Sequence, residues 1–239
     1  MNAEIVLYDL ANTKGVCFSP PVWRIRQMLN YKQIPYTTIF LEFPDIAPTL
    51  QTLGLASPES GKYTVPAIHL IPTNTYMMDS APIAEFLEST YPSPPVPLES
   101  LLGRQIESQA RDVIGPAFRT SIVPREIQVL SPRAQEYFRN TREAILGHAL
   151  EDLLAGDSEE RVWEEVADGM RAVDELIRSG PEGPFVLGKK PSGADLDFFI
   201  SGSLQSARVV DEGVFERCVA YPGFKEVYEA CLPFMERRN

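Results

Sequence analysis

A stretch of four prolines within seven residues, Tyr91 to Pro97, constrains the fold more than any other feature of the chain. Proline lacks a backbone N–H and fixes φ, so this stretch cannot continue a helix and indicates a stiff linker. Strand patterns precede it, and long helical patterns follow it. The sequence therefore predicts two domains, residues 1–92 and 104–239, joined by a linker at residues 93–103.

The first domain alternates strand and helix patterns. The expected elements are a strand at Ile5–Tyr8, a helix from Pro20 to Lys32, a strand at Tyr36–Leu41, a hairpin of Val65–Leu70 and Thr75–Met78, and a helix from Asp79 to Glu88. Because a strand-helix-strand unit joins parallel strands, the first two strands should be parallel neighbours. Between them and the hairpin, residues 44–55 predict one short helix and a loop.

The second domain carries amphipathic helix patterns with almost no strand signal. The expected helices run from Leu98 to Arg119, from Pro132 to Leu154 and from Ser158 to Ser179, and a last one contains Leu196 and Ile200. The segment Ser192 to Asp195 before that last helix resembles a capping box. The predicted fold class is α/β followed by all-α.

Composition and charge exclude several kinds of protein. A net charge of -11 and a pI near 4.8 argue against a nucleic-acid surface, which needs clustered Lys and Arg. No apolar run is long enough to span a membrane, and the N-terminus lacks the pattern of a signal peptide. We therefore expect a cytoplasmic protein.

Cysteine and histidine usage argues against disulfides and metals. Cys17, Cys218 and Cys231 form an odd, sparse set without C-x-x-C spacing, which favours a reducing compartment. The two histidines, His69 and His148, lie far apart without carboxylates at ligand spacing. We expect no metal site.

A helix start at Ser19 is the candidate reactive position. Serine followed by Pro20 is typical of a helix N-terminus, because the hydroxyl can cap free N–H groups and proline suits the first turn. The apolar positions from Val22 to Leu29 predict an inward face, with Arg24, Arg26 and Gln27 pointing elsewhere. The positive end of the helix favours an anion such as a thiolate. On these residues alone, a serine such as Ser19 is more often only a cap than a reactive residue.

Four features together resemble the cytosolic glutathione transferases. They are the segment Ser19 to Arg26, Val65-Pro66 before a hairpin, the pair Asp79-Ser80, and the Ser192 to Asp195 box with Asp197 beyond it. The segment Ser19-Pro-Pro-Val-Trp-Arg-Ile-Arg26 is similar to the serine-type classes, notably the zeta class and fungal etherase-like members. Pro20 and Pro21 stand where the zeta class has Ser and Cys, which leaves Ser19 as the matching hydroxyl. The resemblance implies a thioredoxin-like first domain and a helical-bundle second domain.

The resemblance also implies a glutathione site and a catalytic residue. Ser19 would be catalytic, and Pro66 would be a cis-proline that aims the backbone of Val65 at the cysteinyl part of glutathione. Ser80 would hold the γ-glutamyl carboxylate and Asp79 the γ-glutamyl amine. The implied glutathione-binding residues are Ser19, Lys62, Val65, Pro66, Asp79 and Ser80, with Lys62 reaching the glycyl carboxylate.

Other positions bear on the second substrate and on rival mechanisms. Tyr8 and Cys17 stand where other classes of the family carry a catalytic Tyr or Cys. The residues expected to line the second-substrate pocket, between the domains, are Phe18, Arg111, Phe118 and Arg119. We expect Tyr8 to be a core residue and Cys17 a small loop residue.

The resemblance implies an enzyme that activates the glutathione thiolate for attack on a small electrophile, as in detoxification or secondary metabolism. If the adduct collapses after bond rotation, the same site is a glutathione-dependent cis/trans isomerase, and ether cleavage is a related possibility. A non-catalytic ligand carrier or assembly module is the alternative of another class. Glutathione would be the substrate or cofactor, no metal or nucleic acid would bind, and the chain would form a homodimer.

Overall fold

The computed structural model describes residues 4–56, 61–191 and 196–236. A four-stranded sheet has the order β2-β1-β3-β4, formed by β1 (Ile5–Leu10), β2 (Tyr36–Leu41), β3 (Ala67–Leu70) and β4 (Thr75–Met78). β1 and β2 are parallel, with Ile5 opposite Tyr36, and the other pairs are antiparallel. The predicted parallel neighbours and hairpin are therefore confirmed.

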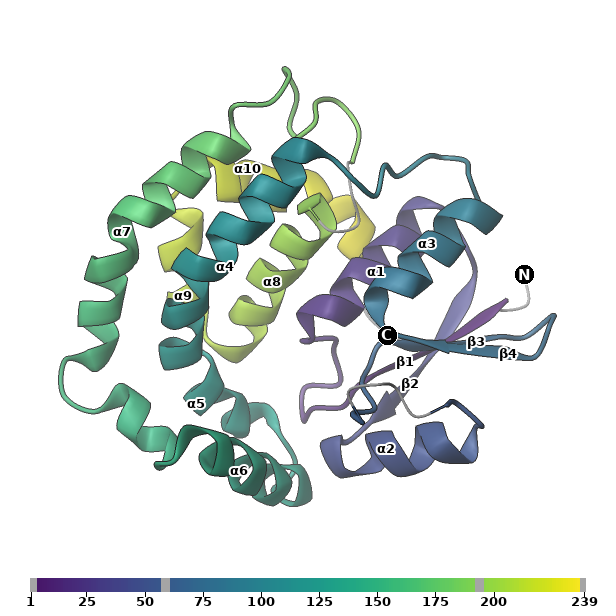
Figure 1. Ribbon diagram of the computed structural model, residues 1–239, viewed down its shortest axis with the longest axis horizontal. Helices are drawn as coiled ribbons and strands as arrows, with labels where there is room; N and C mark the ends of the chain where they lie inside the picture. The colour runs from purple at the N-terminus through teal and green to yellow at the C-terminus, as the bar shows by residue number, and fades with distance from the viewer. Residues whose placement is uncertain (1–3, 57–60, 192–195, 237–239) are drawn as a thin grey trace.

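Helices cover both faces of this sheet (Figure 1). α1 (Pro20–Tyr31) and α3 (Ser80–Thr90) lie on one face, and α2 (Phe43–Thr52) lies on the other. α2 is longer than the short helix expected there, because Pro48 is accommodated inside it. The sheet with helices on both faces is the thioredoxin-like arrangement predicted from the resemblance.

The elements that follow in the described chain are all helices. Its elements are α4 (Leu101–Ser121), α5 (Val123–Glu126), η1 (Ile127–Val129), α6 (Pro132–Leu146), η2 (Leu150–Leu154), α7 (Ser158–Ile177), α8 (Phe198–Val210), α9 (Glu212–Val219), α10 (Pro222–Cys231) and η4 (Leu232–Met235). The single helix predicted from Pro132 to Leu154 is wrong. Gly147, at φ 79°, ends α6 in the left-handed conformation that glycine adopts readily. The Ser192 to Asp195 box lies outside the described residues.

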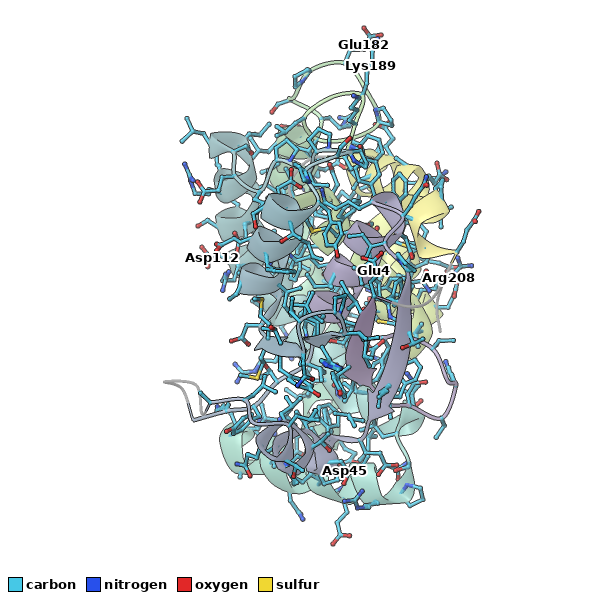
Figure 2. All side chains as sticks on the ribbon, turned by 90° about the vertical axis from the view of Figure 1, so that its right-hand side faces the viewer. Glu4, Asp45, Asp112, Glu182, Lys189 and Arg208 are labelled. Atoms are coloured by element: carbon cyan, nitrogen blue, oxygen red, sulfur yellow. The ribbon has the colours of Figure 1, made fainter. Side chains whose placement is uncertain are left out.

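The two halves of the molecule contact each other at both ends of their interface. α1 packs on α8, and α2 packs on α6, as the side-by-side ribbons in Figure 1 indicate. At the α2 end, Arg133 of α6 binds Asp45 with N–O distances of 2.6 Å. Figure 2 labels Asp45 at this end of the molecule. The domain limits proposed above remain a prediction.

α1 is buried on both of its faces, which corrects the sequence analysis. Arg24, Arg26 and Gln27 were expected to point away from the packed face, yet they are 6%, 0% and 0% exposed. The reason is that α1 lies between the sheet and α8, and its polar side chains have partners on β1, α3 and α8. Gln27 donates to the carbonyl of Phe198 at 2.9 Å and accepts from the Ser201 hydroxyl at 2.9 Å.

A glycine on α8 permits this close packing. A Cβ at Gly202 would lie 2.6 Å from the Cβ of Trp23, a distance at which one of the two helices must shift. The sequence pattern of α1 predicts a polar face on this helix, but it does not predict that α8 covers that face.

A buried salt bridge joins β1 to α1. Asp9 and Arg26 have fully buried side chains, and the Arg26 Nε lies 2.9 Å from the Asp9 Oδ2. The other Asp9 oxygen accepts from the backbone N–H of Leu10, and Arg26 also donates to the Thr38 hydroxyl on β2. One guanidinium therefore connects α1 to two adjacent strands.

None of the helices within residues 4–56, 61–191 and 196–236 is both long and apolar enough to cross a membrane.

We expect Arg26→Met to destabilise the fold by about 3 to 5 kcal/mol, because it leaves the Asp9 carboxylate buried without its partner. The double variant Asp9→Leu with Arg26→Met should lose much less, since it removes both charges. Urea unfolding of both variants measures the free energies. A loss below about 1 kcal/mol in Arg26→Met would contradict the role given to this pair.

Candidate functional site

Two of the predicted site residues, Pro66 and Asp79, meet at one end of the strands. Tyr8 near the end of β1 lies opposite Ala67, and Ala67 lies opposite Met78 at the end of β4. Pro66 and Asp79, the neighbours of Ala67 and Met78, therefore lie together. The N–H of Asp79 donates to the carbonyl of Pro66 at 3.2 Å.

The segment before β3 has the geometry that the resemblance implied. The Val65–Pro66 peptide bond is cis. The Thr64 hydroxyl donates to the Asp79 carboxylate at 2.8 Å, which ties this segment to the start of α3. Asp79 is exposed, has a φ of 75°, and makes no side-chain capping bond to α3. Its side chain is therefore held toward the Val65–Pro66 segment.

The N-terminus of α3 carries a cation that the sequence analysis missed. Arg24 of α1 donates from Nη1 to the Ser80 hydroxyl at 3.1 Å. Ser80 is the first residue of α3 and is partly buried, whereas Lys62 on the preceding segment is exposed. A guanidinium and a helix N-terminus next to one another form a strongly anion-attracting corner. No spacing in the sequence predicts this contact, which joins residues far apart in the chain.

Ser19 stands directly before α1 and is 9% exposed. The alternative that Ser19 is only a helix cap finds no support, because the structure has no side-chain capping bond there. Pro20 and Pro21 explain part of the missing capping bond, since neither has a backbone N–H to donate. Val22 is the first residue of the helix with a backbone N–H. The hydroxyl is therefore not committed to the helix.

The two rival residues are buried, as expected. Tyr8 is 5% and Cys17 0% exposed. Burial raises the pKa of the Tyr8 phenol, and Tyr76 adds to this. Burial also raises the pKa of the Cys17 thiol well above its ordinary value, and Asp9 raises it further although Arg26 opposes. A reactive thiol needs the opposite shift, so Cys17 has the environment of a structural cysteine.

Two adjoining cavities lie between the start of α1 and the helices α4 and α8. Their volumes are about 350 and 280 Å³, and both are lined by Pro20, Gly115, Phe118 and Ser203. Of the predicted second-substrate residues, Phe118 lines both cavities, Arg111 the larger one, and Phe18 and Arg119 the smaller one. The structure thus brings all four to one connected space.

The larger cavity is almost wholly apolar, and charge is confined to its rim. Arg111 is exposed and pairs with Glu107 one turn away at 2.6 Å. The smaller cavity also has Glu126 in its wall, a residue that the sequence analysis did not single out. Within the described part of the chain, no three His, Cys, Asp or Glu side chains gather in a way that could hold a metal ion.

Comparisons with known proteins agree with this geometry. The model of the glutathione S-transferase N-terminal domain matches residues 18–90, and that of the C-terminal domain matches residues 102–216. The chain is 39% identical over 197 residues to the glutathione S-transferase-like protein ustS of Aspergillus flavus, covering 74% of this chain and 70% of that protein. This chain belongs to the glutathione S-transferase family.

Solved structures of family members resemble it along the whole chain. A glutathione S-transferase of Ceriporiopsis subvermispora, determined in complex with glutathione, is 28% identical and has a TM-score of 0.83, with 98% of both chains covered. The glutathione transferase GSTFuA3 of Phanerochaete chrysosporium is 25% identical, with a TM-score of 0.79 and 98% of both chains covered.

The family and fold predicted from the sequence are therefore confirmed, as is the general class of a glutathione-dependent transferase or isomerase. The serine-type subclass and the individual site residues remain predictions.

Proposed function

We propose that this chain binds glutathione at the edge of the sheet where Val65, Asp79 and Ser80 meet, and transfers its thiolate to a small electrophile. The observation that carries the proposal is the position of Ser19. Its neighbours Phe18 and Pro20 line the cavities, and its own hydroxyl is not used as a helix cap. A donor at this position can face both the thiol and the electrophile.

The edge of the sheet suits the three parts of glutathione. The backbone of Val65, before a cis-proline, would pair with the cysteinyl part of the tripeptide. The Ser80 hydroxyl, with Arg24 bound to it, would hold the γ-glutamyl carboxylate. Asp79, oriented by Thr64, would bind the γ-glutamyl amine. Lys62 would approach the glycyl carboxylate from its exposed position.

The start of α1 would lower the pKa of the glutathione thiol. A hydrogen bond to a charged group contributes about 1.5 to 3 kcal/mol, and one pKa unit corresponds to about 1.4 kcal/mol. One donor can therefore lower the thiol pKa by about one or two units. Pro20 and Pro21 supply no N–H groups, which shifts this task from the backbone toward the Ser19 hydroxyl.

We expect Ser19→Ala to lower turnover with glutathione and an electrophile by about 10- to 1000-fold, by analogy with the loss of one oxyanion-stabilising donor. Tyr8→Phe and Cys17→Ala are the matched controls and should change turnover little, because both residues are buried. Steady-state kinetics measures the turnover of the three variants. Loss of activity in Cys17→Ala, with a mixed disulfide in the native protein, would assign the chain to the cysteine-type transferases instead.

Ser80→Ala should weaken glutathione binding, because it removes the hydroxyl from the γ-glutamyl carboxylate, a contact worth about 1.5 to 3 kcal/mol. Titration calorimetry measures this as an increase in Kd of about 10- to 100-fold. Ser89→Ala is a suitable control, since that hydroxyl donates to the carbonyl of Phe86 in its own helix. An unchanged Kd in Ser80→Ala would contradict the placement of the carboxylate.

We further propose a homodimer, in which the first domain of one subunit contacts the second domain of the other. Sedimentation equilibrium at micromolar concentration measures the mass directly. A species of 26.7 kDa, the mass of a single chain, would contradict the proposal.

A cytoplasmic location also belongs to this proposal. It is supported by Cys17, Cys218 and Cys231, which are all free and buried rather than paired in disulfides. Fractionation of the producing cells tests it, and recovery of the protein outside the cytosol would contradict it.

A further inference from the structure

The smaller cavity contains a carboxyl group for which binding glutathione provides no role. Glu126 is the last residue of α5, the short helix that follows α4, and it lines the same cavity as Phe18 and Pro20. These two residues flank Ser19 in the chain. The carboxyl group and the proposed thiolate position therefore border one space.

The neighbours of Glu126 leave its carboxyl unpaired within the described residues. Arg125, next in sequence, points away and forms a double hydrogen bond with Glu159 at 2.7 and 2.8 Å. Arg125 also pairs with Asp211 at 3.0 Å. The charge adjacent to Glu126 in sequence is thus neutralised elsewhere, while Glu126 itself lines the smaller cavity.

Charged groups on the surrounding helices have only a weak electrostatic effect on the Glu126 carboxyl. Arg142 of α6 acts on it through space, but its guanidinium lies 4.8 Å from the ring centre of Phe138. Arg119 of α4 lines the same cavity and is exposed. On η2, Glu151 pairs with Arg139, and Asp152 accepts from the backbone of Ala149. η1 carries no titratable side chain.

Burial is the main influence on this carboxyl. It raises the pKa of Glu126 to about 7, while Arg142 opposes the shift. A raised pKa means that a large fraction of the group is protonated near neutral pH, where an ordinary carboxyl is fully ionised. Glu126 can therefore donate a proton in the pH range in which a bound thiolate also exists.

We propose that Glu126 is the general acid of the reaction and that the second substrate is an α,β-unsaturated carbonyl compound. This rests on the proposed transfer of the glutathione thiolate. Displacement of a halide needs no acid in the cavity, since the leaving group departs as a stable anion. Addition to an unsaturated carbonyl does need one, because an enolate forms on the substrate itself.

The step balances without an added reagent. The thiolate sulfur forms a bond to the β-carbon, and the π electrons of the C=C bond move to give the enolate. The Glu126 carboxylic acid then transfers its proton to the enolate, which completes the saturated adduct. The resulting Glu126 carboxylate takes up one proton from water. This balances the proton that the glutathione thiol released when it ionised.

The test compares two electrophiles in the full-length chain and in Glu126→Gln. Benzylideneacetone is an enone, whereas chlorodinitrobenzene is an aryl halide whose chloride needs no proton. We expect Glu126→Gln to lower kcat for the enone by about 100-fold, within the range of general acid catalysis, and to leave the aryl halide rate unchanged. If Glu126 had only a structural role, Glu126→Gln would lower both rates together, and that result would overturn the proposal.

The pH dependence gives a second readout. The ratio of the enone rate to the aryl halide rate cancels the thiolate fraction common to both. In the native chain this ratio should fall as pH rises through about 7, because the acid form of Glu126 is lost. In Glu126→Gln the ratio should be low and independent of pH. A ratio independent of pH in the native chain would overturn the proposal.

Two further outcomes separate this inference from the function on which it rests. A native chain that conjugates the aryl halide but not the enone overturns the role of Glu126 and leaves the thiolate transfer intact. A native chain that conjugates neither probe, or that fails to bind glutathione in calorimetry, contradicts the proposed function and this inference with it.

Discussion

The salt bridge between Asp9 and Arg26 determines where the reactive end of the molecule lies. Both side chains are fully buried, and the pair joins the end of β1 to the second turn of α1. Trp23 adds to this by donating from its indole N–H to the carbonyl of Cys17 at 3.1 Å. Since these contacts hold both the loop and the helix, they also hold Ser19 between them.

The loop from β1 to α1 is anchored from the helical half as well. The N–H of Thr13 donates to the carbonyl of Val129 at 2.8 Å, and the Lys14 ammonium donates to the carbonyl of Val209. In Figure 1 this loop lies between the sheet and the ends of α4 and α5. Residues from both halves thus build the cavities, and neither half alone would complete them. This explains why the polar groups that we assign to chemistry, Ser19 and Glu126, come from different halves.

Local signals in the sequence predicted the parts of the fold that depend on nearby residues. The parallel pair, the hairpin and the helix start at Pro20 follow from short patterns of apolar, β-branched and proline residues. The interactions between distant segments were not predictable in this way. Arg24 and Arg26 were expected only to point away from the packed face of α1. Their burial depends on α3, β1 and α8, which periodicity within one helix cannot reveal.

The candidate site shows the same division. Val65, Pro66, Asp79 and Ser80 were predicted together through the family resemblance, and the sheet register places them at one edge. Capping of α1 was the alternative role for the hydroxyl of Ser19, but the structure has no capping bond there, and two prolines leave the first turn short of N–H donors. Glu126 carries no sequence signal, since its raised pKa depends on desolvation in the assembled fold. A motif identifies residue types, whereas their protonation states depend on the assembled neighbours.

The most direct test of the central claim is a pH titration of the thiolate absorbance of glutathione bound to the native chain and to Ser19→Ala. The account predicts that the bound thiol titrates about one to two units below free glutathione in the native chain. In Ser19→Ala most of that shift should disappear. A native shift that survives intact in Ser19→Ala would contradict the account and would assign the stabilisation to the backbone N–H groups of Phe18, Ser19 and Val22.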